Sequence, residues 1–513
     1  MHAIVIGGGV AGTVSAIALR RQGAEVTLFE AHPDPGGEVG SFVSLAVNGL
    51  RGLAAIDCLE RVQSRGMPIA RMRMWSAKGQ LIADVPRGRR TTDPMRSITL
   101  MRGHLVAELR AAAEEAGVRL VTGERLVAVD PDGTARFASG LTATGDLLVG
   151  ADGIRSVVRG ALDPDAPTPR YAGVWVISGR SPGAVAGPSA RDSSPRSVGE
   201  VGASVVPVPG DGSGRSVGEV GASVVPVGGD GSGRSVGEVG ASVVPVGGDG
   251  SGRSVGEVGA SVVPVPGVAG RSVGDFGVPV VPVAGDGSGW SVGEVGASAA
   301  PVPGVASRRA VDEVSGASPG EGTFNMTVGA HGAFVHVVPP SGGEVWWQAQ
   351  VNSPNPPGER GGEWLLWLDG LFAAEPVPRR IIAATTQLHR HSVNQVLDLV
   401  RVWHDARIVL VGDAAHPVGA GQGASMAIED GVVLGAMIGA AGTVHDGLAR
   451  YEAARRERVT RVLRAADDNR EAKQAGPVRR RLTEIGMSLF FERFYERATG
   501  WLYDYEPVPT LKS

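Results

Sequence analysis

The pattern of apolar and polar positions is clearest in the first thirty residues. A short apolar run over residues 2–6 leads directly into glycines, and a second apolar run over residues 25–29 ends in Glu30. Between the two runs, small residues from about Thr13 onward have the spacing of a helix that can pack closely. The pattern therefore predicts a buried strand, a tight turn, a helix and a second strand.

Two later apolar runs have the same form. Residues 146–149 lead into Gly150-Ala151-Asp152-Gly153, and residues 406–411 lead into Gly412 and Asp413. Each run is short, apolar and followed by a turn, which is typical of a buried strand in a parallel sheet.

Helical spacing and strand alternation predict the remaining elements. We expect helices over residues 47–65, 103–116, 424–440, 445–469 and 477–503, and a hairpin of strands over 332–339 and 344–351. Side chains alternate between the two faces of a strand, so Trp346, Gln348 and Gln350 share one face of the second hairpin strand. We expect one face of this strand to pack on core and the other to line a substrate cavity.

The first turn has the glycine spacing of a dinucleotide-binding site. Gly7, Gly9 and Gly12 form the pattern G-x-G-x-x-G, in which Gly8, Val10 and Ala11 take the variable positions. The first glycine permits the turn, the second lets a pyrophosphate approach the backbone, and the third lets the helix pack on its strand. Glu30 has the position of the acid that accepts hydrogen bonds from a ribose.

The middle of the chain changes composition abruptly. A unit rich in glycine, valine, serine and proline begins at Arg196 and recurs at Arg215, Arg234 and Arg253, with degenerate copies at Arg271 and Trp290. The period is 19 residues, and one copy has 18. Because the unit has few large side chains to bury, we predict a disordered insertion over residues 187–318. Stacked short β units are the alternative.

Composition narrows the possible classes of protein. The net charge of −4 gives no electrostatic footprint for nucleic acid, and no apolar run is long enough to span a membrane. Cys58 is the only cysteine, which excludes an intrachain disulfide and a thiolate metal cluster. We expect a cytoplasmic protein without a metal site or a stable membrane association.

Four separated motifs together resemble a known family. They are the glycine turn with Glu30, Arg102 at the start of a helix, Asp152-Gly153, and Gly412-Asp413 with Pro417 and Gly421-Gln422-Gly423. A cation at a helix start opposes the helix dipole, so Arg102 by itself suggests an anionic partner. In this order and spacing the motifs resemble the class A FAD-dependent aromatic monooxygenases, which have the p-hydroxybenzoate hydroxylase fold.

The resemblance implies roles for these residues. Gly7, Gly9, Gly12 and Glu30 would hold the ADP half of FAD, with Val10 and Ala11 in the same turn. Arg102 would reach the pyrophosphate or ribose, and Asp152 is linked to FAD and NAD(P)H. Gly412 and Asp413 would bind the flavin side. Pro417 and the backbone of Gly421, Gln422 and Gly423 would lie beside the isoalloxazine, where N–H groups stabilise negative charge.

The activity implied is oxygenation of an aromatic or polyketide-like small molecule. NAD(P)H would reduce FAD, O2 would add to form a flavin C4a-hydroperoxide, and the distal oxygen would pass to the substrate. Trp346, Gln348 and Gln350 are candidates for lining the substrate cavity, and His336 is a candidate general base. The insertion lies in the substrate domain and puts activity in more doubt than FAD binding.

Other functions share parts of this pattern. An FAD-dependent reductase or dehydrogenase would have the same nucleotide motifs but would not insert oxygen into a product. A non-catalytic, repeat-bearing protein on a flavin fold would lack bound FAD. A flavin-dependent halogenase would carry a Trp-x-Trp-x-Ile-Pro stretch, which neither tryptophan cluster of this chain matches.

The expected architecture is an α/β fold with a Rossmann-like FAD-binding domain, an interleaved β-sheet substrate domain and C-terminal helices. We expect FAD-binding parts at 1–70, 101–165 and 401–440, substrate-domain parts at 71–100 and 166–400, and C-terminal helices over 441–513. The oligomeric state and the choice of NADH or NADPH are left open by the sequence.

Overall fold

The computed structural model describes the chain in several ranges. They are residues 1–33, 41–183, 322–340, 343–358, 360–418, 421–473 and 495–507, with five short segments of the repeat. The chain divides into two compact units, Met1–Pro188 with Ala306–Ser513, and Ser189–Val305.

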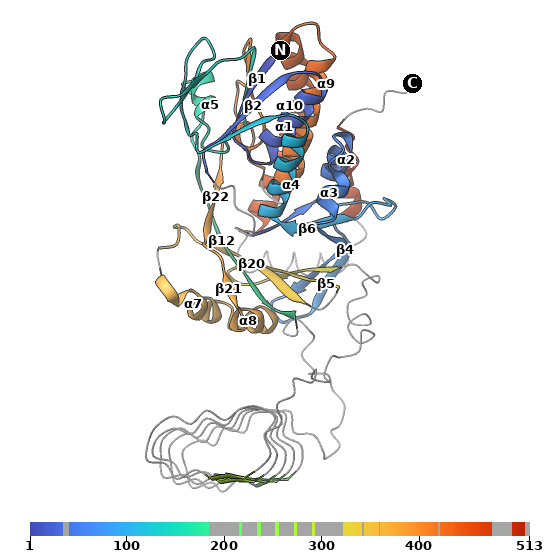
Figure 1. The fold of residues 1–513 in the computed structure, drawn as a ribbon. Helices are drawn as coiled ribbons and strands as arrows, with labels where there is room; N and C mark the ends of the chain where they lie inside the picture. Colours follow the sequence, from blue (N-terminus) through green and yellow to red (C-terminus); the bar gives the residue numbers. More distant parts are fainter. Residues whose placement is uncertain are drawn as a thin grey trace. The chain divides into compact units, whose positions relative to one another are not determined.

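The first unit contains a five-stranded parallel sheet made from distant parts of the chain (Figure 1). Its strands lie in the order β23-β11-β1-β2-β7. Their bounds are β1 His2–Ile6, β2 Glu25–Glu30, β7 Arg119–Thr122, β11 Leu147–Gly150 and β23 Ile408–Leu410. Every residue of β11 and β23 is buried, which explains why these strands are continuously apolar and do not alternate.

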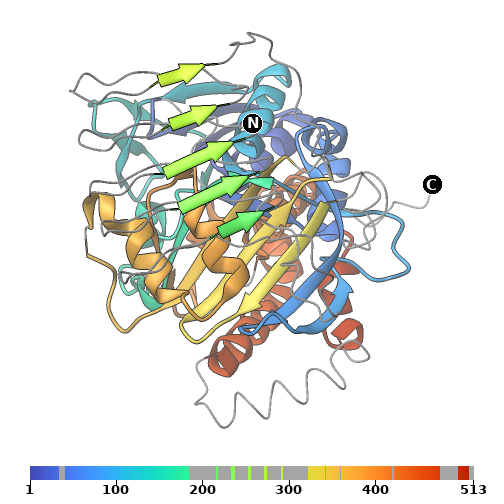
Figure 2. The ribbon, with the colours of Figure 1, turned by 90° about the horizontal axis from the view of Figure 1, so that it is seen from below.

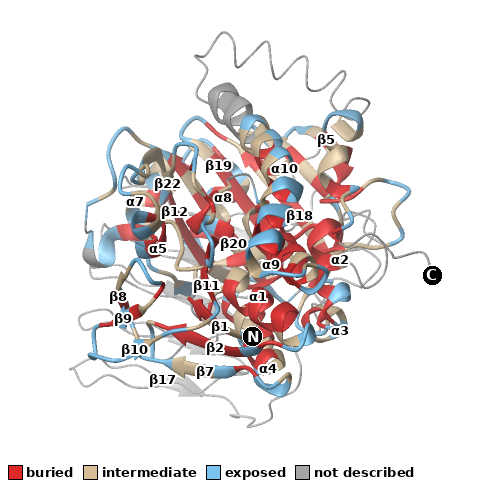
Figure 3. Cartoon of the chain, turned by 90° about the horizontal axis from the view of Figure 1, so that it is seen from above, coloured by how far each residue is buried: buried red, intermediate tan, exposed pale blue. Residues whose placement is uncertain are grey.

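Helices from both ends of the chain pack around this sheet and on one another. They are α1 (Val10–Arg21), α2 (Val47–Ala55), α3 (Leu59–Gln63), α4 (Arg102–Glu115), α5 (Val157–Leu162), α9 (Gly423–Gly439) and α10 (Val444–Lys473). Buried residues, red in Figure 3, make up most of α1 and most of α9. Small residues allow these two helices to approach closely. A Cβ at Gly435 would lie 2.6 Å from the Cβ of Ala18.

The second sheet of this unit has ten strands. Eight lie in the order β21-β12-β20-β19-β18-β4-β6-β3, while β22 pairs with β12 and β5 pairs with β4. The bounds are β3 Phe42–Leu45, β4 Met67–Ser76, β5 Leu81–Pro86, β6 Ser97–Met101, β12 Arg170–Pro182, β18 Gly322–Val328, β19 Gly332–Val338, β20 Glu344–Asn352, β21 Gln387–Leu388 and β22 Ser392–Val396. The hairpin predicted over 332–351 is confirmed by β19 and β20.

One face of the ten-stranded sheet is covered by helices. After the short turn η2 (Gly361–Glu363), α7 (Trp364–Leu371) and α8 (Pro376–Ala383) pack against β12, β19 and β20 (Figures 1 and 2). The buried cluster there includes Trp175, Phe334, Trp347 and Leu368. The residues on the opposite face form a separate buried cluster, to which β4 and β5 contribute.

The smaller elements complete the first unit. A three-stranded sheet has the order β10-β9-β8, with β8 Leu126–Val129, β9 Ala135–Phe137 and β10 Thr142–Ala143. The turn η3 spans Gly412–Ala414. Among the described residues, none of the helices combines the length and the apolar character needed to cross a bilayer.

Five short strands are described in the second unit, each at the start of a repeat copy. They are β13 Arg215–Val217, β14 Gly233–Val236, β15 Gly252–Val255, β16 Arg271–Val273 and β17 Trp290–Val292. Neighbours pair in parallel with equivalent residues of successive copies opposite each other, as in Arg215 and Arg234. The rest of the insertion lies outside the described residues, so its disorder stays a prediction.

One predicted helix differs from the structure, and another is described only in part. The helix expected over 47–65 is divided into α2 and α3 because Asp57 has a φ of 56° and ends the first helix. Aspartate tolerates this left-handed conformation better than most residues, so a periodicity count does not detect the break. Of the last helix, expected over 477–503, residues 495–503 are described and helical, and the earlier part lies outside the described residues.

Candidate functional site

The loops that follow four parallel strands meet at one edge of the five-stranded sheet. Parallel neighbours end at the same edge, and the order β23-β11-β1-β2 therefore brings together Asp413, Asp152, Gly7 and Glu30. Glu30 and Asp413 are three strand spacings apart, roughly 14 Å. In open α/β sheets this edge is where nucleotides bind.

The first of these loops is the glycine turn between β1 and α1. Gly7 has a φ of 103°, and a Cβ at Gly12 would lie 1.9 Å from the carbonyl oxygen of Gly7. A larger residue at either position would break the turn. A Cβ at Gly9, in contrast, would meet no atom within 4 Å. The backbone is thus open to a ligand at the start of α1, where the helix dipole favours an anion.

Glu30 is held at the end of β2 by several donors. Its Oε2 accepts hydrogen bonds from the Gly8 N–H at 2.8 Å and from Arg110 Nη2 at 3.1 Å, and its Oε1 accepts from the His32 N–H at 2.9 Å. Arg110 Nε also donates to the Gly8 carbonyl at 2.7 Å. Arg110 therefore joins the acid to the glycine turn.

Arg110 was not predicted from the sequence. It lies on α4 between the buried residues Leu109 and Ala113, and both members of its ion pair with Glu30 are buried. The only available signal was a cation within the apolar stripe of a helix. Its partner is 80 residues away, so the sequence does not reveal what it contacts.

The loop after β23 is fixed by buried charges on α9 and α10. Asp430 accepts hydrogen bonds from the Gly412 N–H at 2.8 Å, from His416 Nε2 at 2.6 Å and from Arg455 Nε at 2.8 Å. Burial alone would raise the pKa of Asp430, but the charges of His416 and Arg455 and these hydrogen bonds lower it to about 2. Glu429 binds Arg455, Arg458 and Asn48. Glu429 and Asp430 are thus structural hydrogen-bonding residues inside α9.

Asp413 and Arg102 lie within electrostatic reach of each other. Asp413 is exposed to solvent, yet the dense protein around it raises the pKa of its carboxyl, while His416 and Arg102 oppose that rise. Arg102 is itself exposed at the start of α4, and its backbone N–H donates to Ser41 O at 3.2 Å. An exposed acid and an exposed cation from different elements therefore lie near each other.

The loop before α9 ends in a buried polar group that lacks a partner. Gln422 is buried, and its Oε1 accepts no hydrogen bond from the described residues. Gly421 is exposed with a φ of 75°, and Pro417 is half-buried. The first turn of a helix also has N–H groups without intrahelical acceptors. An orphaned amide oxygen beside these N–H groups fits a ligand with donors and acceptors along one edge, as an isoalloxazine has.

Asp152 uses its carboxylate to cap a helix. Ser156 Oγ donates to it at 2.5 Å, and the N–H groups of Val157 and Val158 donate at 2.7 and 3.2 Å. Burial raises the pKa of this carboxyl, and these hydrogen bonds oppose the rise. A direct role of Asp152 in binding FAD or NAD(P)H stays a prediction.

The predicted cavity residues and the predicted base lie on opposite faces of the ten-stranded sheet. Trp346, Gln348 and Gln350 are half-buried, and Trp346 stacks on Phe42 with ring centroids 6.5 Å apart. His336 is opposite Trp347 on the face that α7 and α8 cover, and burial lowers its pKa to about 4. His336 and Trp346 therefore cannot serve one cavity.

Within the described ranges, His, Cys, Asp and Glu side chains nowhere form a group of three or more that could hold a metal ion. Cys58 is buried beside α3, and burial raises the pKa of its thiol to about 11.

Comparison with known proteins agrees with this geometry. A family model described as an FAD binding domain matches residues 1–207 and 374–466. A probable 2-heptyl-3-hydroxy-4(1H)-quinolone synthase of Rhodococcus erythropolis is 35% identical over 162 residues, which cover 32% of this chain and 41% of that protein. Kynurenine 3-monooxygenase of Salinispora arenicola is 36% identical over 169 residues, 30% of this chain and 37% of that protein.

The chain thus spans about two fifths of the length of these curated relatives. Among solved structures, Klebsiella pneumoniae HpxO complexed with FAD and uric acid has a TM-score of 0.61 at 20% identity. That likeness covers 98% of this chain and 96% of the other, and it shows a shared fold.

Proposed function

Because the chain belongs to the FAD-binding-domain family of class A flavin monooxygenases, we propose that it is an FAD-dependent monooxygenase. It would use NAD(P)H and O2 to oxygenate an aromatic or polyketide-like small molecule. The curated relatives are matched over part of their length only, so this activity is inferred from family membership and from the site.

One observation carries the proposal. The two loops expected to grip opposite ends of FAD, at Glu30 and at Asp413, follow strands of the same parallel sheet and face the same edge. Glu30 and Asp413 are more than 380 residues apart in the sequence. Loops from both ends of the chain that meet at one sheet edge can bind the two ends of a single extended ligand.

The residues suggest a division of roles along the cofactor. Gly9 and the start of α1 would meet the pyrophosphate, and Glu30 would accept hydrogen bonds from a ribose. Arg102 and Asp413 would bind phosphate and ribitol groups in the middle. Gln422, with the N–H groups of Gly421 and Gly423, would line the flavin ring.

FAD, when bound, accepts a hydride from NAD(P)H and activates O2 for transfer of one oxygen atom. The protein's own contribution is electrostatic and positional. The N–H groups at the start of α9 would stabilise negative charge that develops near them, because a helix N-terminus carries partial positive charge. The ten-stranded sheet would orient the substrate through Trp346, Gln348 and Gln350 and exclude water.

The first test is a visible spectrum of the purified protein, followed by identification of the released cofactor. We expect flavin absorbance and release of FAD on denaturation. Colourless protein that also fails to bind added FAD would overturn the proposal and favour a non-catalytic protein.

The second test separates oxygenation from simple NAD(P)H oxidation. Aromatic compounds that speed NAD(P)H consumption are incubated with the enzyme under ¹⁸O2, and products are analysed by mass spectrometry. We expect one labelled oxygen atom in the product. NAD(P)H consumption that only releases hydrogen peroxide, with every compound tried, would favour a reductase.

A further inference from the structure

The last described residues of the chain return to the neighbourhood of the candidate FAD site. Residues 495–507, here called the C-terminal strap, are helical over 495–503. They contact three distant parts of the chain, which are the segment after β5, the start of α2, and α10.

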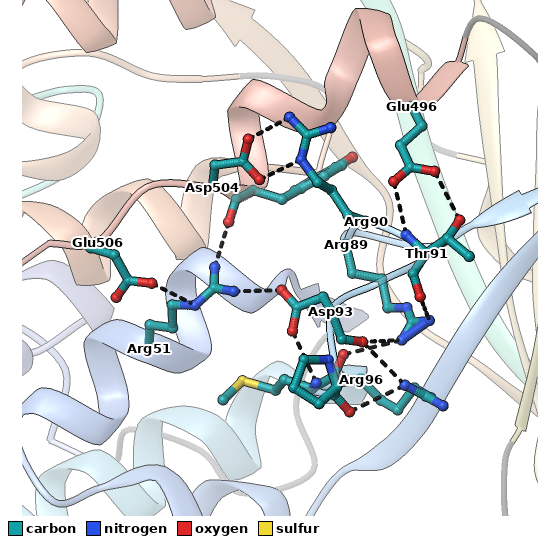
Figure 4. Close-up of polar contacts among 12 residues, drawn as sticks. Arg51, Arg89, Arg90, Thr91, Asp93, Arg96, Glu496, Asp504 and Glu506 are labelled. Atoms are coloured by element: carbon teal, nitrogen blue, oxygen red, sulfur yellow. Dashed lines mark hydrogen bonds and ion pairs between the residues drawn. The ribbon is translucent and has the colours of Figure 1, made fainter.

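Polar side chains bind the strap to the segment after β5 (Figure 4). Arg90 forms a bidentate ion pair with Asp504, with Nε to Oδ1 at 2.6 Å. Glu496 accepts hydrogen bonds from the Thr91 N–H at 3.0 Å and from its hydroxyl at 2.8 Å. A Cβ at Gly500 would lie 2.5 Å from the Arg90 guanidinium, so this glycine lets the cation lie against the strap helix. Because both partners of the ion pair are more than a third exposed, the pair is weak by itself and sensitive to salt.

Arg51 of α2 joins the strap to both of its neighbours. Its Nη1 donates to the Tyr503 carbonyl oxygen at 2.5 Å, its Nε lies 3.0 Å from Glu506 Oε1, and its Nη2 binds Asp93 (Figure 4). One guanidinium thus connects the strap, α2 and the segment after β5.

Tyr503 is the apolar anchor of the strap. It is 4% exposed and forms a buried cluster with Ala46 and Val47 at the start of α2. The Val47 N–H donates to Gly88 O at 3.0 Å. The Ala46 N–H donates to Ser425 Oγ at 3.2 Å, and Ser425 belongs to the first turn of α9. Tyr503 therefore supports, through the start of α2, the helix start that we propose for the flavin ring.

Arg458 connects the strap to α9 by a second path, through α10. Its Nη2 donates to Leu502 O at 2.9 Å and to Glu429 Oε1 at 2.6 Å. Its guanidinium carbon lies 4.0 Å from the centroid of the Tyr505 ring. Glu429 is fully buried inside α9, so its carboxylate depends on such donors.

Support from outside matters because α9 begins without a side-chain cap. Gln422 occupies the N-cap position but makes no capping hydrogen bond, and its Oε1 accepts none from the described residues. The N–H groups of an uncapped first turn have no intrahelical acceptors, and they gain stability from packing or from a ligand. The strap and a bound ligand therefore stabilise the same turn, and each favours the other.

We propose that Tyr503 is a positioning residue for the cofactor site. The closed strap holds the first turn of α9 in the conformation that binds FAD, and bound FAD in turn favours the closed strap. This inference rests on the proposed function, since it needs FAD at the start of α9.

The first test measures hydrogen exchange of the full-length protein by mass spectrometry, with and without added FAD. Peptides that cover the strap should exchange more slowly when FAD is bound, because linkage acts in both directions. Peptides that cover α7, on the ten-stranded sheet, should be unaffected. Equal exchange of the strap with and without FAD would overturn the proposal.

The second test measures the dissociation constant of FAD by flavin fluorescence. Tyr503→Ala removes the buried ring and should weaken FAD binding about 10-fold, because apparent affinity falls with the closed fraction of the strap. Tyr503→Phe keeps the ring and should bind FAD as the wild type does. Wild-type affinity in Tyr503→Ala would contradict the positioning role.

A variant at exposed positions avoids any question of folding. Asp504→Asn combined with Glu506→Gln should raise the dissociation constant of FAD roughly 3-fold at low salt. The difference from the wild type should vanish near ~1 M NaCl, where the wild-type ion pairs are screened. The matched control is Asp369→Asn, which breaks an exposed bidentate pair with Arg379 and should leave FAD binding unchanged at every salt concentration. Equal FAD affinity of the double variant and the wild type at low salt would count against closure by these ion pairs.

These outcomes are distinct from those that test the proposed function. Wild-type protein that does not bind FAD at all would overturn both proposals. FAD binding that neither responds to the strap variants nor protects the strap from exchange would overturn the role of Tyr503 alone.

Discussion

At the scale of single residues, the candidate site depends on buried ion pairs that the sequence does not reveal. The glycine turn and Glu30 could be predicted because their spacing is local and has a known physical reason. Arg110 could not, because a cation on α4 gains its meaning only when the fold brings it to Glu30. The Asp430 network is similar, since its partners lie on η3, α9 and α10.

Replacing Arg110 with glutamine should weaken both the fold and FAD binding. The change leaves the buried Glu30 carboxylate without its cation, which we expect to lower the free energy of unfolding by about 3 kcal/mol. Urea unfolding and titration of the apoprotein with FAD measure the two effects.

The matched control is Arg65→Gln, which removes an exposed ion pair between Arg65 and Glu108. Glu108 lies on α4, the helix that also carries Arg110. It should change stability by less than about 1 kcal/mol. FAD affinity that is equal in Arg110→Gln and the wild type would show that Arg110 does not position Glu30.

His336 predicts a pH dependence of stability. In the folded protein burial lowers its pKa to about 4, whereas the unfolded chain takes up a proton near the ordinary value of about 6.5. The unfolded state thus binds more protons between these values, and stability falls as the pH drops from 6.5 to 4. The full loss is on the order of 3 kcal/mol.

Urea unfolding at several pH values, compared between the wild type and His336→Leu, measures this term. The variant should have a smaller decrease in stability across that window. Parallel curves for the two proteins would contradict the assigned shift.

At the scale of elements, hydrophobic periodicity predicted most strands and helices, because each is buried either along its whole length or on one side. The parallel strands are continuously apolar, and the helices at the surface have a stripe of apolar residues along the side that faces the core. The break at Asp57 was not predicted, since it depends on a single φ angle. The close contact of α1 and α9 depends on glycines that a pattern of apolar residues treats as neutral.

Gly435→Ala should destabilise the protein despite the better helix propensity of alanine. The added Cβ would lie 2.6 Å from Ala18 Cβ and 2.9 Å from the Ala18 carbonyl carbon, so the helices must separate. We expect a loss of about 1–3 kcal/mol. Gly370→Ala in α7, where a Cβ meets no atom within 4 Å, should be neutral or stabilising by up to about 1 kcal/mol. Thermal unfolding of both variants tests the contrast, and a stabilised Gly435→Ala would refute the close packing.

At the scale of the whole molecule, the chain leaves the ten-stranded sheet after β12 and returns at β18. These strands are separated by β20 and β19, about 14 Å across the sheet. Strand directions alternate from β12 to β18, so the end of one and the start of the other lie at the same sheet edge. The repeat is therefore inserted where a short connection would suffice.

Deleting residues 189–305 should preserve the FAD-binding unit. Residues 183–188 and 306–321 would remain, and each extended residue spans up to about 3.3 Å, which is ample for the distance. We expect unchanged FAD content and a melting temperature within a few degrees of the wild type, measured by absorbance and calorimetry. Protein that expresses but has lost FAD would show that the repeat supports the cofactor site.

The assembly of the parallel sheet also sets an order of events during synthesis. Strand β1 leaves the ribosome first, but its neighbour β11 follows only at residue 147, and the edge strand β23 only at residue 408. At about 5–20 residues per second, the nascent chain waits tens of seconds before this sheet can close. Flavin capture must therefore come late, after nearly the entire polypeptide has been translated. A chain that ended within the repeat would contain the glycine turn but lack β23 and the loop at Asp413 that we propose for the flavin side.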